Sequence, residues 1–242
     1  MYQNITATRR EMIKNLAMLA GTVAMISPAS ALATAVGPTN TEIASERPKF
    51  RQALLQTMEV AVGSPNKYLP KASALQASIN QGPAGESYPV QAWRQLLSNL
   101  RGASAYDQIT AVHQFFNQVT YVTDNADTWR MPNQFLCEGG DCEDYAIAKL
   151  ITLRLLGFHQ DRVRVLFVKN TRTGIDHAVT VVYMDGKALI LDNNQSHVVR
   201  PEAVAYYQPI CSFDDRRLWL HWVPGDGNKA VATMQQRVAR QG

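Results

Sequence analysis

The sequence predicts an α+β fold, with helices first along the chain and an antiparallel sheet after them, over residues 86–225. Apolar residues recur at helical spacing over 88–119. Three β-rich runs then fall within 163–192, and Asp185-Gly186 between the last two is a strong hairpin turn. Helical patterns that precede a block of strands are typical of α+β domains.

Three helices are expected before the sheet. The first begins near Tyr88 and the second near Tyr106, each with apolar residues at helical spacing. The third spans 141–157, because an apolar run follows Asp141 and Gly157 ends it, and glycine is a common C-cap. A short extended piece and a polar loop, 119–122 and 123–134, connect the second helix to the third.

The predicted sheet is built from the β-rich runs 163–169, 177–184 and 188–192. An apolar segment, 219–222, follows near the end of the chain. We expect that segment to close the core of the domain.

Residues 1–33 have the features of an export signal. Arg9, Arg10 and Lys14 precede a short apolar stretch, and small residues around Ala33 form a cleavage-like site. The apolar stretch of about 11 residues is shorter than the roughly 20 that a membrane span needs. The arginine pair leaves the twin-arginine and the ordinary secretory routes both open. We therefore expect a periplasmic protein that is cleaved near Ala33.

The segments that flank the predicted domain are less regular. Residues 34–85 are expected to be flexible or partly helical, with one helical piece around 50–62, and residues 226–242 form a tail. The formal net charge is only +4 over 242 residues, and no dense basic stripe carries interleaved aromatic residues. The sequence therefore gives no support for a nucleic-acid partner.

Cys142 is the predicted nucleophile. The chain has three cysteines, so an exported protein would keep at least one thiol outside any intramolecular disulfide. Cys142 follows Gly139-Gly140-Asp141 at the start of the third predicted helix. Backbone N–H groups that lack partners at a helix start favour a thiolate and can hold the oxyanion formed in acyl transfer.

His177 and Asp192 are the predicted partners of Cys142. A thiolate nucleophile needs a histidine for proton transfer and a third group that orients the histidine ring. His177 opens one predicted strand and Asp192 closes the next, and the Asp185-Gly186 turn brings both residues to the same open end of a hairpin. The sequence therefore predicts a Cys-His-Asp arrangement.

Each of the three residues also has a simpler explanation when taken alone. Cys142 could be a small buried residue, His177 a polar residue at a strand edge, and Asp192 a turn residue that caps its own backbone. The chain has four further histidines. His197 and His221 are weaker alternative bases, and His113 and His159 are expected at ordinary surface positions.

Four segments carry a resemblance to a known family. They are Gly140-Asp141-Cys142-Glu143-Asp144-Tyr145-Ala146-Ile147-Ala148-Lys149, Arg154-Leu155-Leu156-Gly157, His177-Ala178-Val179 and Leu191-Asp192-Asn193. They resemble the bacterial transglutaminase-like cysteine proteases, among them the LapG-type periplasmic proteases. The resemblance spans residues 86–222 and leaves out the leader and residues 34–85.

The resemblance implies a papain-like fold in the transglutaminase arrangement, with the nucleophile at a helix N-terminus packed on the antiparallel sheet. Cys142, His177 and Asp192 match the family triad. The family cleaves a large surface adhesin near its N-terminus, at a pair of alanines, and so releases cells from a biofilm. An inner-membrane receptor for cyclic di-GMP sequesters the protease when that signal is high.

The resemblance also implies calcium beside the active site, with Asp141, Glu143 and Asp144 as the matching acidic residues. Carboxylates supply the hard oxygen ligands that Ca²⁺ prefers, but acidic residues in a first helical turn also stabilise the helix dipole without a metal. Carboxylates beside Cys142 would raise its pKa and disfavour the thiolate. A bound cation would relieve that repulsion.

Several questions stay open from the sequence. Cys137 and Cys211 could form a disulfide, which we favour over a Cys137–Cys142 bond that would block the nucleophile. The same triad would also serve a transglutaminase or a peptide amidase. An exported binding domain without catalysis is the remaining alternative.

Overall fold

The structure is a computed structural model that describes residues 54–63, 87–123 and 129–222. The predicted export signal 1–33 with its cleavage site, most of the segment 34–85 and the tail 226–242 lie outside the described residues. Within the described parts of the chain, no helix has both the length and the apolar character needed to cross a membrane.

Apart from strand β1 (Met58–Gly63), the helices precede the strands along the chain, as the sequence predicts. The helices are α3 (Tyr88–Asn99), α4 (Ala105–Phe116), α5 (Pro132–Glu138) and α6 (Cys142–Leu155). The strands are β1 (Met58–Gly63), β2 (Val163–Asn170), β3 (Asp176–Met184), β4 (Lys187–Leu191), β5 (Tyr207–Phe213) and β6 (Leu218–Trp222). Short 3₁₀ turns lie at Leu54–Gln56, Gln160–Arg162 and Pro201–Val204.

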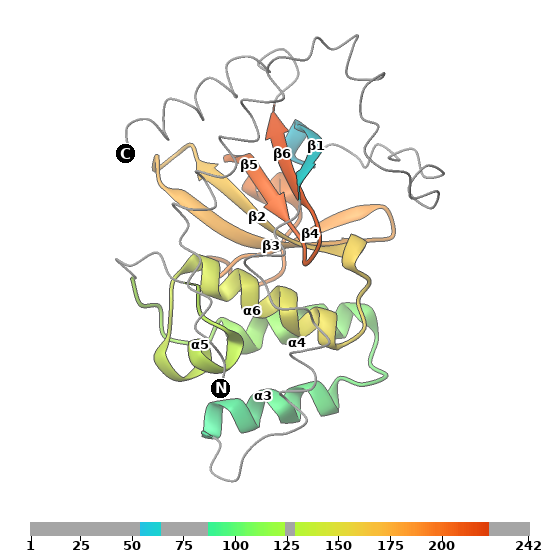
Figure 1. Cartoon of the computed structure of the whole chain (residues 1–242), viewed down its shortest axis with the longest axis vertical. Coiled ribbons are helices and arrows are strands. Elements are labelled where there is room, and N and C mark those ends of the chain that lie inside the picture. Colours follow the sequence, from blue (N-terminus) through green and yellow to red (C-terminus); the bar gives the residue numbers. More distant parts are fainter. Residues whose placement is uncertain (1–53, 64–86, 124–128, 223–242) are drawn as a thin grey trace.

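The six strands form one antiparallel sheet in the order β1-β6-β5-β2-β3-β4. The helices gather on one side of this sheet, with α6 next to the strands and α3 farthest from them (Figure 1). The predicted α+β fold class is therefore confirmed.

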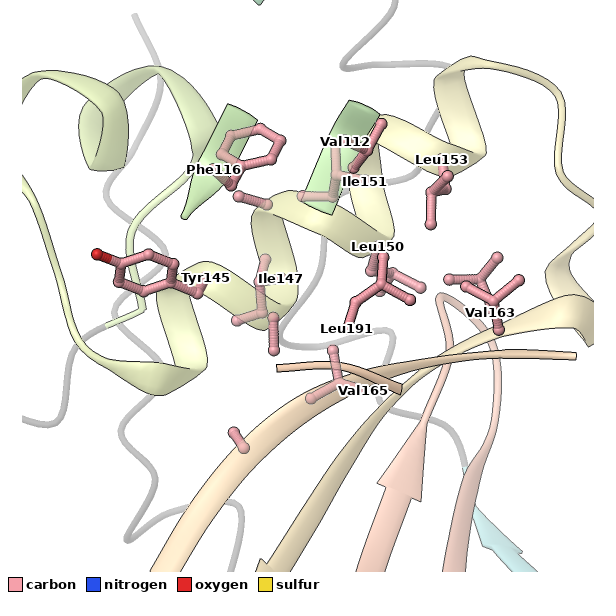
Figure 2. Packing of buried hydrophobic residues seen from close by; sticks show 14 of the residues in the cluster. Val112, Phe116, Tyr145, Ile147, Leu150, Ile151, Leu153, Val163, Val165 and Leu191 are labelled. Atoms are coloured by element: carbon pink, nitrogen blue, oxygen red, sulfur yellow. The ribbon is translucent and has the colours of Figure 1, made fainter. Parts of the chain in front are cut away.

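Helix α6 is the central element of the domain. Its side chains contact helix α4 on one side and the sheet on the other: Ile151 lies near Val112 of α4, and Leu150 lies near Leu191 of β4 (Figure 2). Twelve of its fourteen residues are buried. A helix that is covered all round needs no polar stripe, which explains why the sequence shows a near-continuous apolar run here.

The sheet is covered on both faces, so β2 and β3 are buried along most of their length. One face packs against α6 and belongs to the main core. The other face carries a smaller cluster in which Leu166, Val179 and Ile190 pack with Leu54 and Tyr207. The 3₁₀ turn at Leu54–Gln56 contributes to this second cover.

The hairpin between β3 and β4 has the predicted turn. Asp185 and Gly186 both have positive φ angles, 51° and 74°, as a two-residue type I′ turn requires. The register pairs Met184 with Lys187 and Thr180 with Leu191. The tight turn therefore fixes which residues meet at the open end of the hairpin.

Two predictions of local structure are wrong, and a third is met only by one β-bridge. The helical piece expected around 50–62 is a 3₁₀ turn followed by strand β1, which pairs with β6 at the edge of the sheet. The loop predicted over 123–134 ends in the short helix α5, which has Pro132 in its first turn and buries Phe135. The extended piece 119–122 makes a single bridge, from Tyr121 to Gly140.

Strand β5 is not among the predicted strands, and it contains Pro209, a residue found mostly on edge strands and at bulges. In the structure β5 lies between β2 and β6, and the register of its pairing with β2 shifts at Pro209. This irregularity accommodates a residue that has no backbone N–H to donate.

Two histidines that the sequence analysis placed at the surface or considered as bases are core residues. His113, expected at the surface, is fully buried in α4, and His221, an alternative base, is buried in β6. The imidazole of His221 lies 2.8 Å from the Ser212 hydroxyl and 3.2 Å from the Thr57 hydroxyl, so it is engaged in structure. Burial, followed by the nearby Arg164 charge, lowers the pKa of His221 from 6.5 to about 3.

We predict that this neutral histidine makes the fold sensitive to acid. In the unfolded chain His221 binds a proton below its ordinary pKa of 6.5, whereas in the folded protein it stays neutral until about pH 3. The contribution of neutral His221 to the free energy of unfolding is therefore complete above pH 6.5 and is lost as the pH falls from 6.5 toward 3. Urea unfolding should show that the free energy of unfolding of the wild type falls between neutral pH and about pH 5. In His221→Asn this fall should be smaller by about 2 kcal/mol. His197→Asn, the same exchange at an exposed position, is the matched control.

Candidate active site

Cys142 is the first residue of helix α6, and the turn that leads into it is held by two aspartates. Asp141 is the N-cap: its side chain accepts a hydrogen bond from the Glu143 N–H at 3.3 Å. Asp144 accepts in return from the Asp141 N–H, also at 3.3 Å, which completes a capping box. The cap fixes the start of α6 at the residue that carries the thiol.

The two glycines before Asp141 are required by close packing. A Cβ on Gly140 would lie 2.1 Å from a carboxylate oxygen of Asp144. Gly139 has a φ of 74°, and a Cβ there would lie 2.6 Å from the Thr120 carbonyl oxygen. Side chains at these positions would displace the chain that enters the helix.

His177 and Asp192 meet at the open end of the β3–β4 hairpin. The register would place Asp192 opposite Val179, two residues from His177 and so on the same face of the hairpin. His177 Nε2 lies 2.8 Å from Asp192 Oδ1. The geometry expected from the turn is therefore present.

Asp192 is held by further groups. The Tyr207 hydroxyl donates to Asp192 Oδ2 at 2.7 Å, and the Asn194 N–H donates to Oδ1 at 2.8 Å. The second bond is the self-capping turn that was the simpler explanation for Asp192, so this residue caps its turn and contacts His177 at once. These hydrogen bonds and the His177 charge lower the pKa of Asp192 despite the opposing effect of burial.

The start of α6 packs against the strand that carries His177. The Thr180 hydroxyl donates to the Ala146 carbonyl at 2.9 Å, which joins β3 to the first turns of α6. The start of α6, which carries Cys142, therefore packs against strand β3 of the hairpin on which His177 and Asp192 meet.

The acidic residues beside Cys142 act against the thiolate that the helix start favours, as expected from the sequence. Burial, and next the Glu143 carboxylate, raise the pKa of Cys142 far above its ordinary value. The thiol donates to Glu143 Oε2 at 2.9 Å. A full negative charge this close outweighs the partial charge of a helix terminus, so the thiol is protonated unless the carboxylate is neutralised.

The predicted acidic ligands do not all come together. Asp141, Cys142 and Glu143 place one ligand atom each within 4.8 Å of one another. Burial and the Glu143 charge raise the pKa of Asp141 to about 8. The two carboxylates of this group therefore repel each other when both are ionised. This crowding fits a cation held by carboxylate oxygens, while the thiol sulfur is too soft a ligand for Ca²⁺.

Asp144 has a structural role instead. It is fully buried and accepts from the backbone and the guanidinium of Arg130, at 2.6 and 3.0 Å, as well as from the Asp141 N–H. Its oxygens are therefore engaged by the cap and by an ion pair, and the structure does not bring them to the group formed by Asp141 and Glu143.

The disulfide expected between Cys137 and Cys211 is also wrong, and so is its rival with Cys142. None of the three cysteines is in a disulfide. Cys137 is exposed at the end of α5, with its sulfur 3.0 Å from the Ser87 hydroxyl, whereas Cys211 is buried inside the sheet on β5.

Sequence reasoning missed residues that come from distant segments. Tyr207 lies on the unpredicted strand β5, and Arg130 lies in the predicted loop. Burial alternates only over the first four residues of β5, and Pro209 is a residue that argues against an interior strand. Tyr121 stacks on Tyr145 near the acidic group, and burial and the Cys142 charge raise its pKa to about 12.

Comparisons with known proteins agree with this geometry. Residues 90–223 match the family model of the bacterial transglutaminase-like cysteine proteinases. The solved structure of Legionella pneumophila LapG is similar at a TM-score of 0.55 and 28% identity, covering 70% of this chain and 98% of that chain.

Two further Legionella pneumophila LapG structures match as well. The EGTA-treated and calcium-bound forms each have a TM-score of 0.55 and 27% identity, covering 69% of this chain and 98% and 99% of those chains. No curated protein sequence matched the chain. Because the family model covers more than half of the chain, the protein belongs to the bacterial transglutaminase-like cysteine proteinases and is a cysteine protease of the LapG type.

Proposed function

We propose that this protein is a periplasmic endopeptidase in which Cys142 is the nucleophile, His177 the proton-transfer group and Asp192 the residue that orients His177. The observation that carries this proposal is the 2.8 Å hydrogen bond between His177 Nε2 and Asp192 Oδ1, at the hairpin end against which the start of α6 packs. Since Nε2 is engaged by Asp192, Nδ1 is the ring nitrogen left to serve Cys142.

The proposed reaction is thiol-dependent peptide hydrolysis. His177 takes the thiol proton, and the Cys142 sulfur attacks the carbonyl carbon of the scissile peptide bond. Backbone N–H groups at the start of α6 stabilise the oxyanion. His177 then gives its proton to the leaving amine, which leaves a thioester. Water attacks that thioester while His177 accepts a proton, and the carboxylic acid product and the thiol are released.

The proposed substrate is a large cell-surface adhesin, cleaved near its N-terminus, so that cleavage controls attachment in a biofilm. The proposed regulator is an inner-membrane receptor for cyclic di-GMP that sequesters the protease. Membership of the family and the similarity to Legionella pneumophila LapG support both proposals. The predicted export signal supports the compartment in which such an adhesin and receptor would be met.

We also propose that Asp141 and Glu143 hold a calcium ion. The crowded carboxylates beside Cys142 and the calcium-bound form of Legionella pneumophila LapG support this site. When bound, the ion would offset the negative charge that disfavours a thiolate. Asp141 would keep its second task as the N-cap of α6.

The first prediction of this proposal concerns cleavage. Incubation with an N-terminal adhesin fragment from the same cell should give two products, and Cys142→Ser or His177→Ala should lower the cleavage rate at least about a thousandfold because the nucleophile and its base act as a unit. Electrophoresis and mass spectrometry of the products measure the rate and the cleavage site.

Cys137→Ser is the matched control, since Cys137 is exposed and lies outside the site. It should cleave at the wild-type rate. Cleavage by Cys142→Ser at that rate would contradict the proposed nucleophile.

A second prediction concerns calcium and protein stability. Calcium should raise the midpoint of thermal unfolding relative to EGTA, since a ligand at one hundred times its Kd stabilises the folded state by about 2.7 kcal/mol. Asp141→Asn and Glu143→Gln should each reduce this calcium-dependent rise. Thermal unfolding followed by circular dichroism measures it without reference to activity.

Asp144→Asn distinguishes a structural role from a ligand. It should lower the midpoint in EGTA, because the ion pair between buried Asp144 and partly buried Arg130 is lost, yet keep the rise on adding calcium. A wild-type midpoint that does not respond to calcium would argue against the site, and loss of the response in Asp144→Asn would return Asp144 to the ligand set.

A further inference from the structure

A fully buried lysine lies behind the proposed triad. Lys149 is on α6, two turns beyond Cys142, and is 0% exposed. Its ammonium donates to Asn117 Oδ1 at 2.7 Å and to the Leu191 carbonyl at 3.5 Å. Burial lowers the pKa of Lys149 to about 7, and attraction to Asp192 opposes that shift. A buried cation is costly, so its partners need an explanation.

Asn117 continues this network toward Asp192. It is the C-cap residue of α4, and its amide Nδ2 donates to the Asp192 carbonyl at 3.2 Å and to the Gln195 carbonyl at 2.9 Å. Lys149 and Asn117 together therefore contact three main-chain carbonyls, those of Leu191, Asp192 and Gln195.

These three carbonyls belong to the turn that follows β4 and carries the proposed catalytic groups. The turn is closed by a hydrogen bond from the Gln195 N–H to the Asp192 carbonyl, at 3.1 Å. The carboxylate of Asp192, in this turn, contacts His177 Nε2. The side-chain Nδ2 of Asn194 lies 3.3 Å from the same ring nitrogen. The position of the turn backbone therefore sets the position of the His177 ring.

We propose that Lys149 and Asn117 are positioning residues, which hold the turn Asp192–Gln195 and, through Asp192, keep His177 aligned with Cys142. This inference rests on the proposed function, since it gives Asp192 and His177 their roles in the reaction. Neither positioning residue touches the substrate. Their effect is on alignment, and a displacement of about 1 Å at a reacting group can cost a hundredfold in rate.

A role in stability alone is the rival explanation, because an apolar side chain of similar volume can replace a buried charge at little cost. Two substitutions separate the explanations. Asn117→Asp keeps the size of the side chain and an acceptor for Lys149, but puts an oxygen where Nδ2 donates to the turn. Lys149→Met keeps the volume of the lysine stem and removes the donor. Asn99→Asp, the same exchange on an exposed position of α3, is the matched control.

The readout is the rate at which iodoacetamide alkylates Cys142, measured across pH in excess calcium. A thiolate paired with His177 reacts at a lower pH than an ordinary thiol does. Asn117→Asp and Lys149→Met should lower the rate at neutral pH about tenfold or more and move the pH profile toward that of an ordinary thiol. Asn99→Asp should match wild type. In a His177→Ala background, Asn117→Asp should cause no further loss.

Two results would overturn the inference while the proposed function stands. One is an unchanged alkylation profile in both variants, provided that wild type depends on His177. The other is an equal loss from Asn117→Asp with and without His177, which would indicate a structural role alone. An alkylation rate of wild type that is independent of His177 would overturn the proposed function, and the inference with it.

Discussion

The burial of helix α6 on nearly all sides is the constraint on which the rest of the structure depends. The helix separates α4 from the sheet, and its first residue carries the thiol, so the main core and the candidate site share one rigid element (Figure 2). A helix start inside a core must satisfy its backbone N–H groups with side chains. Asp141 and Asp144 meet this need, and the absence of side chains at Gly139 and Gly140 lets the chain approach closely enough for them to do so.

This capping places negative charge beside the nucleophile. Asp144 is neutralised by Arg130, whereas Asp141 and Glu143 stay crowded around Cys142. The arrangement that stabilises the helix start therefore works against the thiolate, since a carboxylate at hydrogen-bond distance outweighs a helix dipole. A bound cation would offset this negative charge while Asp141 keeps its place as the N-cap of α6.

Sequence patterns predicted the parts of the site that are local in the chain. The β3–β4 turn at Asp185-Gly186 determines the hairpin register, and the register brings His177 and Asp192 to one face. The glycine pair and the acidic run likewise indicated the start of α6. Strand β5 could not be predicted in this way, because Pro209 is tolerated only through a register shift against β2, which is a property of the sheet. The acidic neighbours predicted that the pKa of Cys142 would be raised, whereas burial, the larger cause, depends on the tertiary structure.

The residues that hold Asp192 show why the rest of the candidate site could not be predicted from the sequence. Tyr207 comes from β5, Asn117 from the end of α4 and Lys149 from the middle of α6, so three segments far apart in sequence act on one turn. None of these side chains stands out in the sequence: a tyrosine in a strand, an asparagine at a helix end and a lysine in a helix are ordinary. Their significance comes from burial, since each polar group inside the core must find a partner and the turn after β4 offers carbonyls and a carboxylate. The polar network that the core must satisfy therefore includes the carboxylate that contacts His177, so the proposed alignment of His177 would depend on the same contacts that satisfy the core.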